Sequence, residues 1–317
     1  MRRELSFIGR FIKGYFDKDR FVPPGVPRLS IETTNICDSS CVFCPNKLVR
    51  PPPRLMDMDL FKKTVDDFVA MHGKAIDFNA IIGEPLLDPH LLERARYVRQ
   101  FSQFDSLGFV TNLQWLQKFD INDFFSAGFT WLAISTVLSG REQYRAFFGV
   151  DRYEQVIKNI LRLFEENKRR KDKITLLFSL KPTDEPIGAV LNHPDFKKIN
   201  SLSEWDLVEL LKNQAPVSHD WAGLVKLPPY LKRRPVYPRL FRPCGLLYGG
   251  LMVLSNGDIS ACACVNFASN KQLILGNIKT MTLKEAWSSR KLFDLRSGWR
   301  RFNKIPQMCR RCRHYLY

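Results

Sequence analysis

The residues best suited to chemistry in this sequence are three cysteines within one eight-residue stretch. Cys37, Cys41 and Cys44 form a C-x3-C-x2-C run that follows a strand-like segment, Arg28 to Thr33. On a loop, three closely spaced thiols can converge on one metal centre, whereas a helix would scatter them around its surface. Structural zinc sites use four ligands, so three thiolates better suit a four-iron cluster with one open iron. The alternatives are a structural zinc loop or three unrelated buried thiols.

This run resembles the cluster loop of the radical S-adenosylmethionine (SAM) enzymes, C-x3-C-x-Φ-C, with Phe43 at the aromatic position Φ. The resemblance implies that Cys37, Cys41 and Cys44 bind a [4Fe–4S] cluster and that Phe43 packs near the adenine of SAM. In that family the open iron binds SAM, and one electron from the cluster cleaves it to a 5′-deoxyadenosyl radical, which takes a hydrogen atom from the substrate. The resemblance also implies a flavodoxin or ferredoxin as the electron donor.

A second group of cysteines lies beyond residue 243. Cys244 and Cys262 flank an Asn-Gly pair at 256–257 that is typical of a β-hairpin turn, and Cys309 and Cys312 form a C-x2-C pair. Taken alone, these four thiols could form a zinc ribbon. Beside the first loop they resemble a SPASM domain in its shorter "twitch" form, whose signature is C-x(9–15)-G-x4-C. The resemblance implies that all four bind one auxiliary [4Fe–4S] cluster.

Cys264 is surplus to this second group. It could replace Cys262 as a ligand, but the G-x4-C spacing counted from Gly257 favours Cys262. We expect Cys264 to be a buried bystander thiol, because free cysteine behaves as a small hydrophobic side chain.

A short motif after the second predicted strand indicates where SAM is held. Gly83, Glu84 and Pro85 resemble the G-G-E-P element of the family, with Ile82 in place of its first glycine. The resemblance implies that Glu84 is the charge partner of the SAM ammonium and that Pro85 makes a rigid turn.

Further candidates for holding SAM follow the next strands. Thr111, Asn112 and Ser135 match positions that commonly touch the ribose or carboxylate of SAM in the family, although simple strand-end caps are the alternative. Arg145 and Arg152 lie in a stretch that resembles the family's loop before its long helix. A guanidinium suits bidentate binding of a carboxylate, and the sequence does not choose between the two arginines.

The composition is that of an ordinary folded protein, with 317 residues, 45% hydrophobic and 26% charged. No apolar run approaches the roughly 20 residues that a membrane-spanning helix needs, and the N-terminus lacks the apolar core of a signal peptide. Eight cysteines without a secretory signal indicate a reducing compartment and metal binding rather than disulfides. We therefore expect a cytoplasmic protein.

The formal net charge of +17 would attract nucleic acid, an anionic membrane or a phosphorylated substrate. The basic residues are dispersed, with short clusters at 168–171 and 232–234, and no nucleic-acid motif is present. We expect solvated loops at these clusters, no nucleic-acid partner, and a small-molecule substrate that is anionic. Residues 1–20 have the pattern of a basic amphipathic helix that docks on the remainder of the chain, with peripheral membrane contact as the alternative.

Strand and helix patterns alternate along the first half of the chain. Strands are predicted at 28–33, 75–82, 106–112, 131–135 and 173–180, and helices at 59–71, 91–101, 121–127 and 153–166. Such alternation is typical of βαβ units and a mostly parallel sheet. Residues 183–240 are rich in proline and include a strand-like stretch at 205–210, and a further helix is predicted at 283–295.

The family resemblance completes this α/β pattern as a partial (β/α)6 TIM-type barrel, open on one side, with its site at the carboxyl ends of the strands. The expected organisation is an N-terminal helix and linker at 1–27, the barrel at 28–225, and a small C-terminal β-hairpin and helix domain of SPASM or twitch type at 226–317.

The expected reaction is the dehydrogenation of a secondary alcohol of a sugar or cyclitol, with the auxiliary cluster as the electron acceptor. A cluster bound by four cysteines leaves no iron open to substrate, which favours an electron relay over a Lewis acid. The alternatives are epimerisation or the modification of a ribosomally made peptide. A hypothesis from another class is a metal-bound nucleic-acid-binding module without catalytic activity. The substrate's proton acceptor is not identifiable from the sequence.

Overall fold

The computed structural model describes residues 25–49, 51–79, 81–213, 217–218, 220–233, 244–263, 271–298 and 305–312. The helix expected at 1–20 and the surplus Cys264 lie outside these ranges.

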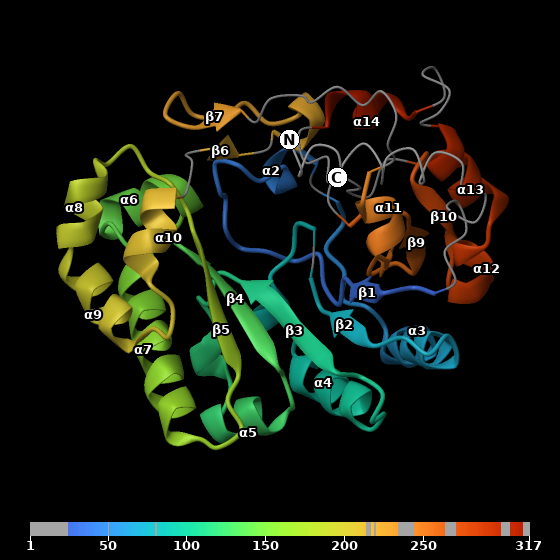
Figure 1. Cartoon of the computed structure of the whole chain (residues 1–317), viewed down its shortest axis with the longest axis horizontal. Coiled ribbons are helices and arrows are strands. Elements are labelled where there is room, and N and C mark those ends of the chain that lie inside the picture. Colours follow the sequence, from blue (N-terminus) through green and yellow to red (C-terminus); the bar gives the residue numbers. More distant parts are fainter. Residues whose placement is uncertain are drawn as a thin grey trace, which may run out of the picture.

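One eight-stranded sheet runs through the described part of the molecule, in the order β10-β9-β8-β1-β2-β3-β4-β5 (Figure 1). Its strands are β1 (Arg28–Ile31), β2 (Ala75–Asp77), β3 (Ser106–Thr111), β4 (Trp131–Thr136), β5 (Thr175–Leu180), β8 (Leu251–Val253), β9 (Asp258–Ser260) and β10 (Ile274–Asn277). The strands from β8 to β5 are parallel, and β9 and β10 extend the sheet in antiparallel fashion. The sheet is an open partial barrel, which confirms the predicted fold class.

Helices cover the outer side of the parallel strands (Figure 1). They are α3 (Met58–Ala70), α4 (Leu91–Arg99), α5 (Ile121–Ser126), α6 (Arg141–Phe148), α7 (Tyr153–Arg169), α8 (Ile187–Asn192), α9 (Pro194–Leu202) and α10 (Leu207–Asn213). The predicted helices in this part of the chain are confirmed to within a few residues at each end. None of the described helices has the length and apolar character needed to cross a membrane.

The two faces of the strands differ in burial. In β4, Leu132 and Ile134 are buried on the helix-covered face, while Ala133 and Ser135, which alternate with them, are only half-buried. Val110 on β3 is 41% exposed. Since neighbouring residues of a strand point to opposite faces, the inner face of the partial barrel remains accessible.

The C-terminal cysteine-containing segment shares this sheet. Its β8 pairs in parallel with β1, and the buried carboxylate of Glu32, just after β1, accepts hydrogen bonds from the hydroxyl (2.9 Å) and the amide (3.3 Å) of Ser255. The predicted hairpin is confirmed: β8 and β9 pair around the Asn-Gly turn, in which Gly257 has a φ of 90° that favours glycine. The sixth parallel strand is therefore supplied by the C-terminal segment.

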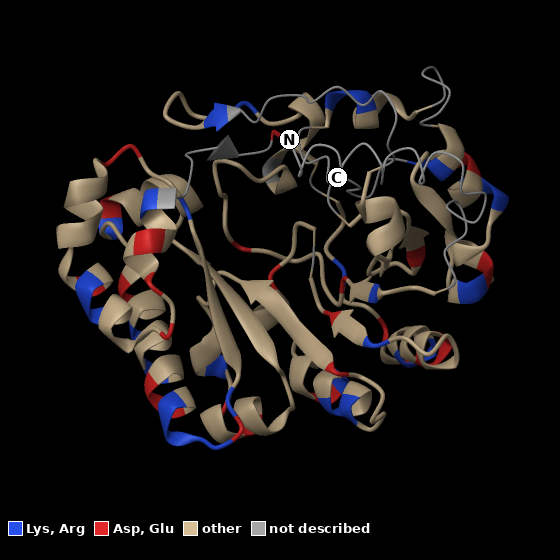
Figure 2. Ribbon diagram, viewed as in Figure 1, with Lys and Arg blue, Asp and Glu red and all other residues tan. Residues whose placement is uncertain are grey.

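The short elements that complete the described chain are α2 (Asn46–Val49), η2 (Pro85–Leu87), η3 (Leu116–Lys118), β6 (Val217–Ser218), η4 (Trp221–Gly223), β7 (Lys232–Arg233), α11 (Leu246–Gly249), α12 (Leu283–Trp287), α13 (Arg290–Ser297) and α14 (Gln307–Arg311). Lys and Arg lie mainly on the outer helices and loops, and the strands carry few charges (Figure 2).

Three predicted elements differ from the structure. The strand predicted at 75–82 ends at Asp77 as β2. The stretch at 205–210 forms part of a helix, α10, because the Asp206 carboxylate caps its first turn by accepting from the amides of Val208 (2.9 Å) and Glu209 (3.1 Å). The helix predicted at 283–295 is two helices, since Ser289 starts a new one by capping the amide of Leu292.

Candidate cluster and cofactor site

The loop that carries Cys37, Cys41 and Cys44 is held by the end of helix α6. The amide of Ser40 donates to the carbonyl of Phe148 (2.8 Å), and the amide of Val42 donates to that of Phe147 (2.9 Å). The last carbonyls of a helix have no partner within the helix, so the loop supplies the missing donors. The next residue, Gly149, has a φ of 70°, and a Cβ atom there would lie only 2.8 Å from that of Ser40. The fit between helix end and loop thus requires glycine.

The three thiols of this loop are half-buried and influence one another. Burial raises the pKa of Cys37 to about 12, with smaller contributions from the charges of Glu84 and Cys44. The pKa of Cys41 is raised well above its usual range by burial and then by the neighbouring thiolates of Cys44 and Cys37. Such a group of soft donors favours a positively charged iron centre, because bound iron would neutralise the thiolates that otherwise repel each other. The donor set therefore fits an iron–sulfur cluster.

Within the described ranges, no three Cys, His, Asp or Glu side chains lie close enough to hold a single metal ion. A four-iron cubane cluster does not need its ligands this close together, because each thiolate binds a different iron of the cluster.

Phe43 lies at the junction of several elements, one residue before Cys44. Its ring packs against that of Phe147 (5.2 Å between centroids), and the Lys181 ammonium lies 5.3 Å from the centroid of the Phe43 ring. Its carbonyl accepts a hydrogen bond of 2.7 Å from the indole of Trp221. Phe43, the aromatic residue of the motif, is thus held in place by contacts of both its side chain and its backbone.

Glu84 holds the strand ends and the cluster loop together. Its buried carboxylate accepts from the hydroxyl of Thr111 (2.6 Å) and the amides of Asn112 (2.8 Å) and Leu86 (3.1 Å), and its own amide donates to the carbonyl of Ile36 (2.8 Å). Burial raises its pKa to about 7 despite these hydrogen bonds. In the structure Glu84 thus joins η2, the end of β3 and the residue before Cys37, and its role as the charge partner of the SAM ammonium stays a prediction.

The residues after β3 continue this network. Asn112 and Gln114 both donate to the hydroxyl of the buried Ser39 in the cluster loop, at 3.3 and 3.0 Å. Between them, Leu113 has a φ of 58°, a left-handed conformation that is rare for a bulky residue. The conformation is held by the side chain of Asn159, which donates to the carbonyl of Leu113 (2.8 Å). Backbone strain is thus concentrated where β3 meets the cluster loop.

Arg152 and Arg145 lie in different surroundings. Arg152 forms an ion pair with Asp38 of the cluster loop, and its guanidinium lies 4.1 Å from the ring centroid of Trp115. The indole of Trp115 also donates to Asp38 (3.0 Å). Arg145 is exposed on α6. Of the two candidates, only Arg152 is shown in contact with the cluster loop, and its contact is made through Asp38.

Lys181 extends the inner face of β5 beyond the end of the strand. Its ammonium donates to the hydroxyl of Ser179 (2.8 Å), which lies opposite Ser135 in the sheet register. Burial lowers the pKa of Lys181 to about 8, and the negative charge of Cys41 opposes that shift. Sequence patterns gave no sign of Lys181, although its place two residues after Ser179 on a predicted strand would have put it on the same face.

The four C-terminal cysteines of the described chain are half-buried thiols that pack against the hydrophobic core, and none forms a disulfide there. Cys309 lies on α14 and Cys312 ends it. Helix α14 packs against η4, whose Trp221 is bonded to Phe43. The short turn η4 therefore contacts both α14, which carries Cys309, and Phe43 in the loop of the first three cysteines.

Comparison with known proteins agrees with this arrangement. The model of the radical SAM superfamily matches residues 31–192, slightly more than half of the chain, and the model of the SPASM iron–sulfur cluster-binding domain matches residues 244–313. Among curated protein sequences, none matches this chain.

Several solved structures share the fold at low sequence identity. The crystal structure of BtrN in complex with AdoMet and 2-DOIA matches with 16% identity and a TM-score of 0.54, over 90% of this chain and 92% of that one. SuiB from Streptococcus suis bound to S-adenosylmethionine matches with 16% identity and a TM-score of 0.61, over 95% and 73% of the two chains. The anSMEcpe structure with AdoMet and a peptide matches with 16% identity and a TM-score of 0.56, over 86% and 84%.

These matches decide against a metal-bound module without catalytic activity, because radical SAM proteins are enzymes that cleave SAM reductively. The chain belongs to the radical SAM superfamily, carries a C-terminal SPASM domain, and has as its cofactors a SAM-binding [4Fe–4S] cluster, an auxiliary iron–sulfur cluster and S-adenosylmethionine.

Proposed function

We propose that this enzyme oxidises a secondary alcohol of a sugar or cyclitol to the ketone. When bound, SAM and the cluster held by Cys37, Cys41 and Cys44 would supply a 5′-deoxyadenosyl radical to take the hydrogen atom of the carbinol carbon. The auxiliary cluster held by Cys244, Cys262, Cys309 and Cys312 would supply the acceptor for the second electron, and the hydroxyl proton would be lost. The reaction consumes one SAM and yields methionine, 5′-deoxyadenosine, a ketone and a proton. The enzyme is thus an oxidoreductase, and we propose a flavodoxin or ferredoxin as its initial electron donor.

Two cysteine sets would hold the clusters. Cys37, Cys41 and Cys44 leave one iron open for SAM, whereas Cys244, Cys262, Cys309 and Cys312 occupy every iron of the auxiliary cluster. A fully thiolate-bound cluster can exchange electrons but offers no site for substrate. We propose the division of the chain into a barrel at 28–225 and a cluster domain at 226–317 on the same basis.

One observation carries this proposal furthest: the segments that carry the two cysteine sets both contact the same short turn, η4. Trp221 of η4 donates to the carbonyl of Phe43, and η4 packs against α14, which carries Cys309. An electron acceptor is useful only within reach of the substrate radical, and this contact supports such closeness.

The match to BtrN supports a small substrate. The BtrN structure contains 2-DOIA, and the match covers 90% of this chain and 92% of that one. The SuiB structure with a precursor peptide is covered to 71%, whereas the anSMEcpe structure with a peptide is covered to 84%, so a peptide substrate stays the alternative.

The test is the double variant Cys309→Ser/Cys312→Ser. It should retain 5′-deoxyadenosine formation from SAM under reducing conditions but lose at least about 90% of ketone formation, because the second electron has no acceptor. Cys37→Ala, as the matched control, should lose both activities. Ketone formation by the double variant at the wild-type rate would contradict the proposal. An epimerised sugar or a modified peptide, with no two-electron change in the substrate, would instead support the runner-up reactions.

A further inference from the structure

We infer that one basic face of this enzyme, formed by α2, β7, α14 and residues 221–226, binds the acidic surface of the protein that delivers the electron for SAM cleavage. The inference deepens the proposed function, because it rests on the electron carrier proposed there but not on the oxidation of an alcohol. It assigns the surface at which that carrier docks. The side chains that define this basic face are Leu48, Leu224, Lys226, Lys232 and Arg311.

The excess of positive charge lies in three segments of the sequence. Residues 39–56, 221–257 and 295–317 contain sixteen Lys and Arg and no Asp or Glu, whereas the remaining chain contains thirty-three Lys and Arg against thirty-two Asp and Glu. The net charge of +17 is therefore almost entirely a property of these segments. They also carry five of the seven proposed cluster ligands, namely Cys41, Cys44, Cys244, Cys309 and Cys312.

The fold brings these three segments together. The indole of Trp221 in the second segment donates to the carbonyl of Phe43 in the first, and η4 packs against α14 in the third. Strand β7 also belongs to the second segment, and it lies along the same border of the molecule as α14 (Figure 1). Figure 2 shows Lys and Arg but no Asp or Glu on β7 and α14. Positive charge from distant parts of the sequence is thus collected near both cysteine sets.

The basic face combines exposed charges with exposed apolar side chains. Lys226, Lys232 and Arg311 are exposed, and no hydrogen bond or ion pair joins their side chains to the part of the chain that the structure describes. Leu48 is 54% exposed and Leu224 is 43% exposed. Apolar contacts within a polar rim are typical of protein interfaces. The backbone of a nucleic acid would use the charges but not the leucines. The basic face therefore favours an acidic protein.

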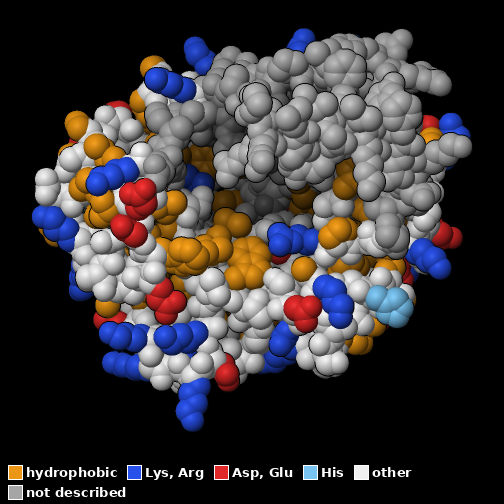
Figure 3. Space-filling model, viewed as in Figure 1, with side chains coloured by type: hydrophobic (Ala, Val, Ile, Leu, Met, Phe, Trp, Pro, Cys, Tyr) orange, Lys and Arg blue, Asp and Glu red, His pale blue; other side chains and the backbone are white. Residues whose placement is uncertain are grey.

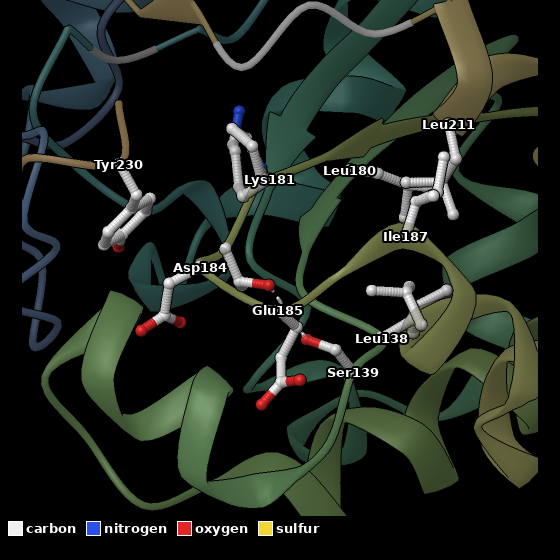
Figure 4. A pocket seen from close by; sticks show the side chains of 12 residues that line it. Leu138, Ser139, Leu180, Lys181, Asp184, Glu185, Ile187, Leu211 and Tyr230 are labelled. Carbon is white, nitrogen blue, oxygen red and sulfur yellow. Dashed lines mark hydrogen bonds between the residues drawn. The ribbon is translucent and has the colours of Figure 1, made fainter. Parts of the chain in front are cut away.

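Other parts of the molecule mix both charges. On the face seen in Figure 3, Lys and Arg of the outer helices stand among Asp and Glu. The cavity of about 300 Å³ beside β5 is lined by Lys181 together with Asp184 and Glu185 (Figure 4). Mixed charges largely cancel over the Debye length, which is about 10 Å at 0.1 M salt. An acidic protein is therefore attracted to the basic face in preference to these regions.

The position of the basic face favours an electron carrier among acidic partners. Leu48 lies four residues after Cys44, and Arg311 lies between Cys309 and Cys312. Each SAM cleavage consumes one electron, which the carrier loses as one carbon–sulfur bond of SAM breaks. Redox partners form small, short-lived complexes, and complementary charge accelerates their association. The basic face supplies this attraction where the electron has to enter.

SAM cleavage driven by two different reductants tests this inference. One reductant is a flavodoxin of net negative charge, kept reduced by NADPH and its reductase, and the other is dithionite, which needs no docking surface. The reconstituted holoenzyme is compared with Lys226→Glu/Lys232→Glu/Arg311→Glu by its formation of 5′-deoxyadenosine. The triple variant should lower kcat/KM for reduced flavodoxin at least about tenfold, because electrostatic steering contributes factors of about 10 to 1,000. The rate with dithionite should change by less than about twofold.

The matched control is Lys158→Glu/Lys168→Glu/Lys171→Glu, which alters the net charge by the same amount. These three lysines are exposed, lie on α7 or just after it, and have no partner among the described residues. The control should lower kcat/KM for flavodoxin by less than about twofold. Raising NaCl from about 50 to about 300 mM should slow flavodoxin-driven cleavage in the wild type and the control more than in the triple variant, because salt screens the attraction.

Three results would overturn the inference. Equal losses in the two triple variants would show that only the net charge matters. A loss with dithionite as large as that with flavodoxin would assign the basic residues to holding the clusters. Binding of a single-stranded RNA that Lys226→Glu/Lys232→Glu/Arg311→Glu abolishes, with flavodoxin-driven cleavage unchanged, would assign the basic face to nucleic acid. Circular dichroism and iron content check the fold, and Lys226→Gln/Lys232→Gln/Arg311→Gln should show a smaller loss of the same kind.

The outcomes also separate this inference from the proposed oxidation. The carrier is followed through 5′-deoxyadenosine, and the oxidation is followed through the ketone. A flavodoxin-specific loss in the triple variant of an enzyme that never forms a ketone would leave the inference standing and overturn the oxidation. Ketone formation with unchanged flavodoxin dependence in the triple variant would do the reverse.

Discussion

Glu84 shows how one buried carboxylate organises the site. It accepts hydrogen bonds from Thr111, Asn112 and Leu86, and its backbone amide binds Ile36, immediately before the first cysteine. Since these partners come from separate stretches of the chain, replacement of this side chain affects the cluster loop and the strand ends together.

The raised pKa of Glu84 predicts a pH dependence of stability. Its pKa rises from 4.5 to about 7 on folding, mainly through burial, so the folded state retains a proton that the unfolded state has lost. The free energy of unfolding should therefore fall as pH rises from about 4.5 to 7, with the full cost, about 3 kcal/mol, present above pH 7. Glu32 and Asp77, whose pKa values are also raised by burial, add to the same trend.

Glu84→Gln should reduce this slope, because an amide does not titrate. It should also lower the stability at pH 5 by about 1–3 kcal/mol, since one of three buried donors loses its acceptor. Urea unfolding of the apoprotein at pH 5.0 and 7.5 measures both effects. Glu93→Gln, at an exposed position, is the control and should keep the wild-type slope. Equal slopes in Glu84→Gln and the wild type would contradict this account.

Gly149 provides a second prediction at the residue scale. Alanine there would adopt a φ of 70° and press on Ser40 of the cluster loop, so Gly149→Ala should lower stability by about 1–2 kcal/mol. It should also reduce the iron bound per chain on anaerobic reconstitution, because the loop must move. Gly188→Ala is the matched control, since a Cβ atom there meets nothing within 4 Å. Normal iron content and stability in Gly149→Ala would show that the loop does not depend on this contact.

The sequence predicts residues that belong to motifs with a recognisable residue type and spacing. It does not predict residues whose role depends on a partner far away in the chain. Motifs singled out the seven cysteines, Glu84, Thr111 and Asn112, whose roles as cluster ligands and SAM contacts stay predictions. They did not single out Trp115 and Trp221, because their partners Asp38 and Phe43 lie 77 and 178 positions away. An isolated tryptophan in a sequence does not reveal which backbone or carboxylate it will reach.

At the scale of elements, η4 is the connection between the two cysteine sets. Trp221 and Ala222 both have left-handed backbones, with φ values of 51° and 60°. Such conformations cost free energy in residues other than glycine and are retained where the surrounding structure holds them. Here the side chain and backbone of Asp220 bind the amide of Gly223, while the indole of Trp221 reaches Phe43.

Trp221→Phe tests this connection, since it keeps an aromatic side chain and removes the N–H donor. The loss of the hydrogen bond to Phe43 should lower stability by about 1 kcal/mol and reduce the ratio of ketone to 5′-deoxyadenosine, because substrate radicals would pass their electrons on less efficiently. Urea unfolding and product analysis measure the two effects. Trp205→Phe, at a side chain that is 51% exposed, should change neither. An unchanged ratio in Trp221→Phe would assign Trp221 a purely structural role.

Elements were predictable where local patterns decide them. The amphipathic pattern of α7 and the alternating burial of β4 are visible in the sequence. The pairing of β8 with β1 was not, because the two strands lie more than 200 residues apart and short apolar strands carry no signal of their partner. The stretch at 205–210 was assigned wrongly because its apolar residues outweighed the helix-starting Asp206.

At the scale of the whole molecule, the sheet makes the barrel depend on the C-terminal domain. Strand β8 covers the edge of β1, whose Leu29 and Ile31 are fully buried. Removal of residues 244–317 would expose this strand edge, and exposed apolar edges promote aggregation. We expect the truncated chain to be recovered mainly as aggregates in size-exclusion chromatography, with the full chain as the control. A monomeric, cooperatively folded product would show that the barrel is independent.

The central claim is that this chain uses SAM to take a hydrogen atom from the carbinol carbon of an alcohol. The most direct measurement is mass spectrometry of the products formed from a sugar or cyclitol alcohol carrying deuterium at that carbon. The account predicts one deuterium in 5′-deoxyadenosine, and a ketone at the labelled carbon in equal amount. Ketone formation with unlabelled 5′-deoxyadenosine, or deuterium transfer without any ketone, would contradict it.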